Sequence, residues 1–138
     1  MRTITMSSVL ALPLLATGLA LPGCIYVNKT SSAPVVALPE GRYTGAIRAA
    51  QAVSFSKDRA QAFMAIAGKP DLEECDQHRL VYALRRDDGF SQQKTDVVLA
   101  LIENPSVTNS TRSMIGSSVE DLASFSSDRA RIAQALAR

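Results

Sequence analysis

The sequence predicts an all-α fold, a short right-handed stack of helical hairpins built from 35-residue repeats. Phe55, Phe90 and Phe125 are three of the four phenylalanines, and each lies 35 residues from the next. The apolar positions that follow keep the same offset, which is typical of stacked repeat architectures. The further matches are Ala62 with Val97 and Ile132, Ile66 with Leu101 and Leu136, Pro70 with Pro105, Leu72 with Val107, Leu80 with Ile115, and Leu84 with Val119.

The first 23 residues are predicted to be a bacterial export signal and not a membrane-spanning helix. Arg2 supplies one positive charge, and a short apolar stretch covers residues 9–21. Pro13 and Gly18 interrupt this stretch, which is shorter than the roughly 20 apolar residues that a transmembrane helix needs. Export to the cell envelope is therefore expected.

The end of this signal, Leu21-Pro22-Gly23-Cys24, resembles the lipobox of bacterial lipoproteins. In that motif the cysteine thiol receives a diacylglycerol and becomes the new N-terminus, so the resemblance implies lipidation of Cys24. More than one acyl chain on one residue gives stable membrane anchoring, which a single chain does not. Ile25 is not an acidic retention residue, so the periplasmic face of the outer membrane is the expected location in a cell with two membranes.

The sequence leaves a second outcome open for Cys24. Pro22 departs from the small residue usual at its position in a lipobox, and ordinary signal-peptidase cleavage after Ala20 is the alternative. Cys24 would then be available for a disulfide with Cys75 across a long loop, in an oxidising compartment.

Residues 24–42 are predicted to form a flexible tether. Pro34, Pro39 and Gly41 accompany a Thr-Ser-Ser cluster in this stretch, and such composition disfavours regular structure. One folded domain is expected after it, over residues 43–138, with repeats starting near 55, 90 and 125.

The start of each first helix is marked by a serine after the phenylalanine. Asp58 and Asp128 would lie in the first turn, facing the positive end of the helix dipole. Serine is a common N-cap because its hydroxyl accepts a backbone N–H. The expected N-caps are Ser56, Ser91 and Ser126.

Prolines and capping signals give the other boundaries. The first helices should end before Pro70 and Pro105. The second helices should begin near Asp71, where Asp71-Leu72-Glu73-Glu74 resembles a capping box, and near Thr108. The segment 43–53 should pack on the first hairpin as a cap, either helical or extended. The predicted helices span 56–68, 72–86, 91–103, 108–122 and 126–137.

Apolar residues at helical spacing identify the expected core. In the first and second helices of the two hairpins, and in the N-terminal cap, these positions are Phe63, Ile66, Ala67, Leu80, Ala83, Leu84, Val97, Val98, Leu101, Ile102, Ile115, Val119, Leu122, Ile47, Ala50 and Val53.

The repeats begin with the segments Ser54-Phe55-Ser56-Lys57-Asp58-Arg59-Ala60, Gly89-Phe90-Ser91-Gln92-Gln93-Lys94-Thr95 and Ser124-Phe125-Ser126-Ser127-Asp128-Arg129-Ala130. Over residues 54–138 the chain resembles a class of uncharacterised bacterial envelope lipoprotein domains whose helical hairpins begin Phe-Ser-x-Asp-Arg. The middle copy departs from this motif at Gln93 and Lys94. The resemblance implies a fold, and it provides no catalytic residues.

Cys75, Asp76 and His78 place a thiol, a carboxylate and an imidazole within about one turn of the second helix. The spacing of Cys75 and His78 would allow them to share a metal ion, but two ligands do not complete a tetrahedral site. We expect Cys75 to be a free, partly buried thiol and His78 to be a surface residue. The alternative is a metal- or redox-responsive protein that uses this pair.

Other chemistry has little support. No serine lies in a nucleophile-elbow pattern, and the chain has one histidine, which argues against a nucleophilic enzyme. Asp58-Arg59 and Asp128-Arg129 recur at equivalent repeat positions, so capping and interhelix ion pairs explain them better than glycoside chemistry. The net charge of +2 is too small for nucleic-acid binding.

The predicted function is therefore a lipid-anchored envelope protein, a non-catalytic protein-interaction or scaffold module. Its expected partners are the membrane, through the lipid on Cys24, and another envelope protein. No catalytic residue, metal or cofactor is expected.

Overall fold

The computed structural model describes residues 40–89 and 91–138, and over this part the fold is all-α, with seven helices and no strand. The predicted signal peptide, Cys24 and most of the predicted tether lie outside the described residues. No helix within the described ranges is long and apolar enough to cross a bilayer. The helices are α1 (Thr44–Gln51), α2 (Ser56–Ala67), α3 (Glu74–Arg85), α4 (Ser91–Glu103), α5 (Asn109–Ser117), α6 (Val119–Leu122) and α7 (Ser126–Leu136).

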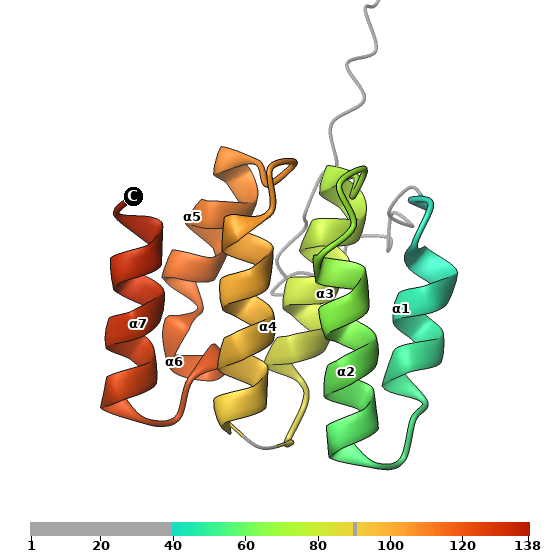
Figure 1. The fold of residues 1–138 in the computed structure, drawn as a ribbon, viewed down its shortest axis with the longest axis horizontal. Coiled ribbons are helices and arrows are strands. Elements are labelled where there is room, and N and C mark those ends of the chain that lie inside the picture. The colour runs from blue at the N-terminus through green and yellow to red at the C-terminus, as the bar shows by residue number, and fades with distance from the viewer. Residues whose placement is uncertain (1–39, 90) are drawn as a thin grey trace, which may run out of the picture.

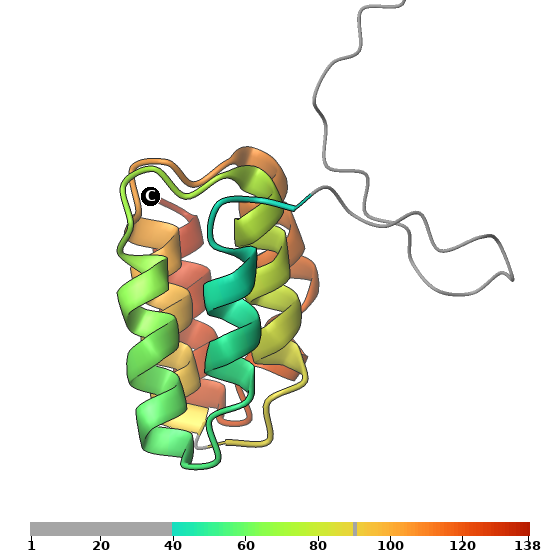
Figure 2. The ribbon, with the colours of Figure 1, turned by 90° about the vertical axis from the view of Figure 1, so that its right-hand side faces the viewer.

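The helices form two layers (Figures 1 and 2). Helices α2, α4 and α7 lie side by side in one row, and all three begin at the same end of the molecule. Helices α3 and α5 lie side by side in the second row. Helix α1 lies at one end of the rows, where it contacts both α2 and α3.

The core lies between these layers, and the expected apolar stripes form it. Almost every predicted core position is less than a tenth exposed, including Phe63, Leu101 and Ile115. Val53 and Val119 are the exceptions, since both are half-buried. The segment 43–53 is mostly helical, and it packs on the first hairpin through the buried Ile47 and Ala50.

The predicted helix over 108–122 is wrong in its middle, because it breaks at Ser118. Ser118 has φ −116° and ψ 12°, which is not helical, and it separates α5 from α6. The break follows Gly116 and Ser117, which are poor helix formers. The other predicted helices are confirmed to within two residues at each end.

The expected serine N-caps are also wrong. Phe55 and Phe125 occupy the N-cap positions of α2 and α7, with extended backbone and no side-chain hydrogen bond to the first turn. Ser56 and Ser126 are instead the first helical residues, as is Ser91 in α4. The phenylalanine holds the extended conformation that an N-cap needs, so the serine begins the helix. Asp58 and Asp128 do lie in first turns, as predicted.

The second helices differ from each other at their starts. A second helix does begin near Thr108, as predicted: Thr108 is the N-cap of α5, and its hydroxyl accepts from the Thr111 N–H at 3.1 Å. The capping box at Asp71 is wrong, because α3 begins at Glu74. The Asp71 carboxylate instead accepts from the Tyr43 hydroxyl at 2.6 Å and from the Arg42 guanidinium. Both hydrogen bonds lower the pKa of Asp71, and the one from Tyr43 has the larger effect.

Gly41 is expected to tolerate no side chain, whereas Gly45 should accept one. An added Cβ at Gly41 would lie 2.4 Å from the carboxylate of Asp76, while one at Gly45 would have no neighbour within 4 Å. Replacing Gly41 with alanine should lower the free energy of unfolding by about 1–2 kcal/mol, through steric overlap with a held side chain. Gly45→Ala, the matched control, should raise it by about 0.5–1 kcal/mol because alanine is the better helix former. Urea denaturation measures both, and equal effects at the two positions would contradict this assignment.

Candidate functional site

Cys75 lies in the first turn of α3, half-buried and disulfide-bonded, so the expectation of a free thiol is wrong. The sequence has one other cysteine, so an intrachain partner has to be Cys24, which lies outside the described residues. A disulfide sulfur is not the thiolate that binds a metal ion. Within residues 40–89 and 91–138, no group of three or more His, Cys, Asp or Glu residues could hold a metal ion.

His78 is buried, with 4% of its surface exposed, so its prediction as a surface residue is wrong. Its Nε2 lies 3.2 Å from the Ser110 hydroxyl oxygen and 3.5 Å from Glu74 Oε1. Among the residues that the structure describes, its Nδ1 has no hydrogen-bond partner. Burial lowers the pKa of His78, and the nearby Glu74 carboxylate partly opposes that effect.

Among the described residues, the contact between Ser110 and His78 is the one that most resembles a serine nucleophile beside its general base. Sequence reasoning missed it because 32 residues separate the pair. To accept the Ser110 proton at Nε2, His78 would have to carry its own proton on Nδ1, which is buried and lacks an acceptor. In a serine triad the carboxylate contacts the nitrogen opposite the serine, whereas Glu74 contacts the same Nε2. The geometry therefore supports a structural hydrogen bond between α3 and α5.

The burial of His78 is expected to make the fold less stable below about pH 6.5, the ordinary pKa of histidine. Below that pH the unfolded chain binds a proton at His78, whereas the folded chain, in which the pKa is lowered, does not. Stability therefore falls as the pH decreases toward the folded-state pKa, with a slope of at most about 1.4 kcal/mol per pH unit. Urea denaturation from about pH 7.5 to 5.5, a range above the ordinary pKa values of most carboxylates, measures the slope. His78→Gln should flatten it, and an unchanged slope in that variant would assign the effect to other groups.

Asp76 is fully buried, and it holds the start of α1 against α3. Its carboxylate accepts from the Tyr43 backbone N–H at 2.7 Å and from the Thr44 hydroxyl at 2.9 Å. A carboxylate at a helix N-terminus also interacts favourably with the helix dipole. Asp76 thus has a structural role and does not combine with Cys75 and His78 into a reactive site.

Two buried amides join the repeats at the same end of the molecule. The Gln77 amide nitrogen donates to Leu72 O and Ser106 O, each at 2.8 Å, and its oxygen accepts from Thr108 N and Thr111 Oγ1. Asn104 joins the end of α4 to the end of α2, because its amide nitrogen donates to the carbonyls of Ala67 and Lys69 at 2.6 and 2.8 Å. Every polar atom of the Gln77 side chain is therefore satisfied, as burial requires.

A hollow of about 380 Å³ lies between the ends of α4 and α7. Its only charged lining residues are Glu103, Arg112 and Arg138, and no serine, threonine, cysteine or histidine lines it. Arg112 already donates to the Ile102 carbonyl at 3.0 Å. The Glu103 carboxylate is the lining group that could act as a base, and no hydroxyl, thiol or imidazole accompanies it in the lining.

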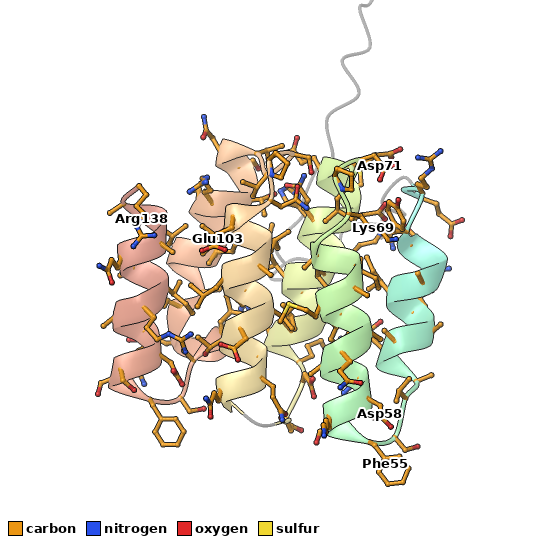
Figure 3. All side chains as sticks on the ribbon, viewed as in Figure 1. Phe55, Asp58, Lys69, Asp71, Glu103 and Arg138 are labelled. Carbon is orange, nitrogen blue, oxygen red and sulfur yellow. The ribbon has the colours of Figure 1, made fainter. Side chains whose placement is uncertain are left out.

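Two exposed phenyl rings distinguish the opposite end of the molecule. Phe55 is 73% exposed and Phe125 is 63% exposed, although phenylalanine is usually buried. Figure 3 shows Phe55 projecting at the end where α2 begins, far from Lys69 and Asp71. The N-cap Phe125 lies at the same end, because α7 begins there. We call these two rings and their flanking serines (Ser54, Ser56, Ser124 and Ser126) the phenylalanine edge.

The arginine that follows each ring fixes the loop ahead of it. Arg59 Nη1 donates to the Val53 carbonyl at 2.7 Å, and Arg129 Nε donates to the Ala123 carbonyl at 3.0 Å. Both carbonyls lie two residues before the phenylalanine. Arg59 also forms a largely buried ion pair at 2.8 Å with Asp87, which lies in the loop after α3, so the pair joins a helix to a loop and not two helices. The motif arginine therefore positions the loop that presents the ring.

The middle repeat keeps this arrangement with a different residue. Lys94, which replaces the arginine, donates to the carbonyls of Asp87 at 2.9 Å and Asp121 at 3.2 Å. A basic side chain at this position thus satisfies loop carbonyls in all three repeats. Lys94 departs from the motif but still donates to a backbone carbonyl of the preceding loop, that of Asp87.

Sequence reasoning used Phe55 and Phe125 only to define the repeat and missed their exposure. The signal that could have identified it is local. Each ring lies between two serines directly ahead of a helix, outside the apolar stripe that faces the core.

The fold and the site define an all-α domain that presents a fixed aromatic edge. Comparison of the chain with protein-family models, curated proteins and solved structures found no match.

Proposed function

We propose that this protein is a non-catalytic interaction or scaffold module of the bacterial cell envelope, built as a right-handed stack of helical hairpins. The exposed phenylalanine edge is the observation that carries the proposal. Aromatic side chains supply much of the energy of protein interfaces, and fixing them beforehand reduces the entropy lost on binding. The geometry of His78 does not favour a serine nucleophile, and the hollow has Glu103 without a hydroxyl, thiol or imidazole beside it.

The proposal includes a membrane anchor, formed by a lipid on Cys24 and joined to the domain by the tether over residues 24–42. Its support is the lipobox-like sequence at the end of an export signal. The proposed location is the periplasmic face of the outer membrane where a cell has two membranes, with another envelope protein as the partner.

The disulfide of Cys75 favours a second candidate, an exported protein without a lipid. One sulfur atom cannot hold both a thioether to diacylglycerol and a disulfide, so lipidation of Cys24 and a bond from Cys24 to Cys75 exclude each other. In the second candidate the disulfide would respond to the redox state of the envelope, with no role for His78 as a ligand.

Intact mass separates the two candidates. The protein is purified from the membrane fraction of its native host, without reductant, beside a Cys24→Ser variant. A mass matching residues 24–138 plus acyl groups, absent from the variant, supports the anchor. An unacylated mass beginning at Leu21, lighter than the reduced chain by the two thiol hydrogens, would refute lipidation and establish the disulfide form.

The interaction function has its own test, which holds for either candidate. Formaldehyde treatment of cells that contain an epitope-tagged full chain should give a discrete heteromeric complex. The matched control is a tagged chain with a core substitution, Leu80→Asp, that prevents folding. Recovery of the folded chain as a monomer alone would contradict the interaction proposal.

A further inference from the structure

The two rings of the phenylalanine edge are held at a set separation. They precede α2 and α7, which flank α4 in one row. Neighbouring helices pack with their axes about 8–10 Å apart, which places the two rings about 16–20 Å apart. The arginine contacts fix both loops, so a partner meets two apolar side chains in defined positions.

The charges beside the rings argue against an anionic lipid surface as the partner. Phe55 is followed by the exposed Lys57 and Asp58 and the half-buried Arg59, and Phe125 is followed by the buried Asp128 and the half-buried Arg129. Binding to anionic lipids uses clusters of exposed basic residues. Here Arg59 is paired with Asp87 and Arg129 donates to the carbonyls of Ala123 and Ser124, which leaves Lys57 beside the exposed Asp58.

The path of the chain also argues against a lipid surface as the partner of the phenylalanine edge. The chain enters α1 beside Asp71, which holds Arg42 and Tyr43. Asp71 lies at the end of the molecule opposite Phe55 (Figure 3). A tether that leads to a membrane therefore leaves from one end, and the phenylalanine edge lies at the other.

We infer that the phenylalanine edge binds a folded envelope protein whose surface has two apolar pockets about 16–20 Å apart, one for each ring. The inference rests on the proposed interaction function and specifies the surface and the chemistry of the partner. Each ring acts as an anchor in a pocket, and the serines beside it provide hydrogen-bonding groups at the rim.

Site-specific photocrosslinking in the native host tests this inference. A benzoyl-phenylalanine is placed in the full chain at position 55 or 125, and at 69 or 82 as controls. Lys69 is exposed at the opposite end, and Tyr82 is an exposed aromatic residue on α3. We expect positions 55 and 125 to crosslink to one and the same protein, and the two controls to give no such product.

Binding of the purified chain to that crosslinked protein is then measured. Phe55→Ala and Phe125→Ala should each weaken the affinity at least tenfold, with unchanged melting temperatures because both rings are exposed. Met64→Ala, on the outer face of α2, is the matched control and should change the affinity less than twofold.

Four outcomes would overturn the inference: crosslinks at 55 and 125 to lipid, to a second copy of this chain or to nothing, or full affinity in both phenylalanine variants. Vesicles of phosphatidylethanolamine and phosphatidylglycerol identify the lipid outcome by cosedimentation. Crosslinks to a partner from position 69 or 82 alone would refute the edge while preserving the interaction function. The absence of a crosslinked protein at all four positions would refute both.

Discussion

Replacing Asp76 with alanine is expected to lower the free energy of unfolding by about 3–4 kcal/mol. The carboxylate is fully buried and accepts from the Tyr43 backbone N–H and the Thr44 hydroxyl. Its removal leaves two donors without a partner at the start of α1 and opens a space between α1 and α3. Urea denaturation followed by circular dichroism measures the loss.

Two further variants and one local measurement make this prediction specific. Asp76→Asn keeps one acceptor oxygen and should lose about half as much, while Asp88→Ala, an exposed aspartate, should change stability by less than about 0.5 kcal/mol. Hydrogen exchange of Asp76→Ala should speed up in α1 more than in α4, because α1 loses its attachment. Equal acceleration in both helices would show that Asp76 does not act through α1.

Replacing Gln77 with alanine is expected to cost about 3 kcal/mol, nearly as much as the loss of Asp76. The Gln77 amide makes four hydrogen bonds while 1% exposed, and they join α3 to the loop before α5 and to Thr111. Truncation leaves the carbonyls of Leu72 and Ser106 without this donor. The midpoint of urea unfolding should fall with little change in the slope, as for a loss confined to the folded state.

An isosteric variant separates hydrogen bonding from packing at this position. Gln77→Glu keeps the volume but turns an oxygen toward the two carbonyls that the amide nitrogen served, so it should destabilise at least as much as alanine. Gln61→Ala, at an exposed position of α2, is the control and should be within about 0.5 kcal/mol of the natural chain. A mild effect of Gln77→Glu would mean that packing, and not the amide, holds the loop.

Helix positions could be predicted from the sequence because local signals fix them. The repeated apolar stripe, Pro70, Pro105 and the Thr108 cap each act within a few residues. The prediction failed where a contact distant in the sequence competed with a local signal. Asp71 resembles a cap in sequence, but its carboxylate is engaged by Arg42 and Tyr43, almost a full repeat away.

The buried polar contacts could not be predicted from single positions. Asp76 reaches Tyr43 across 33 residues, Gln77 reaches Thr111 across 34, and Asn104 reaches Ala67 across 37. These separations are close to the 35-residue spacing in the sequence, because α1 lies against α3, α3 against α5, and α2 against α4. The sequence period indicates which helices are neighbours. Which side chain donates a hydrogen bond and which accepts it depends on the directions of the side chains.

The exposed rings illustrate the same limit for the candidate site. A phenylalanine that recurs with the repeat is expected in the core, since repeats usually share their apolar positions. Phe55 and Phe125 recur but are exposed, and the following Arg59 and Arg129 hold the loops that carry them. The period thus identified the right residues, and the arginine contacts give the direction in which the rings point.

The attachment of Arg42, Tyr43 and Thr44 to Asp71 and Asp76 also has a mechanical consequence. Tension on the chain ahead of Glu40 reaches these contacts before it reaches the body of α1. Two carboxylates on different segments, one before α3 and one within it, share the load. A pulling force on this segment would therefore be carried to α3 and the α2–α3 loop as well as to α1.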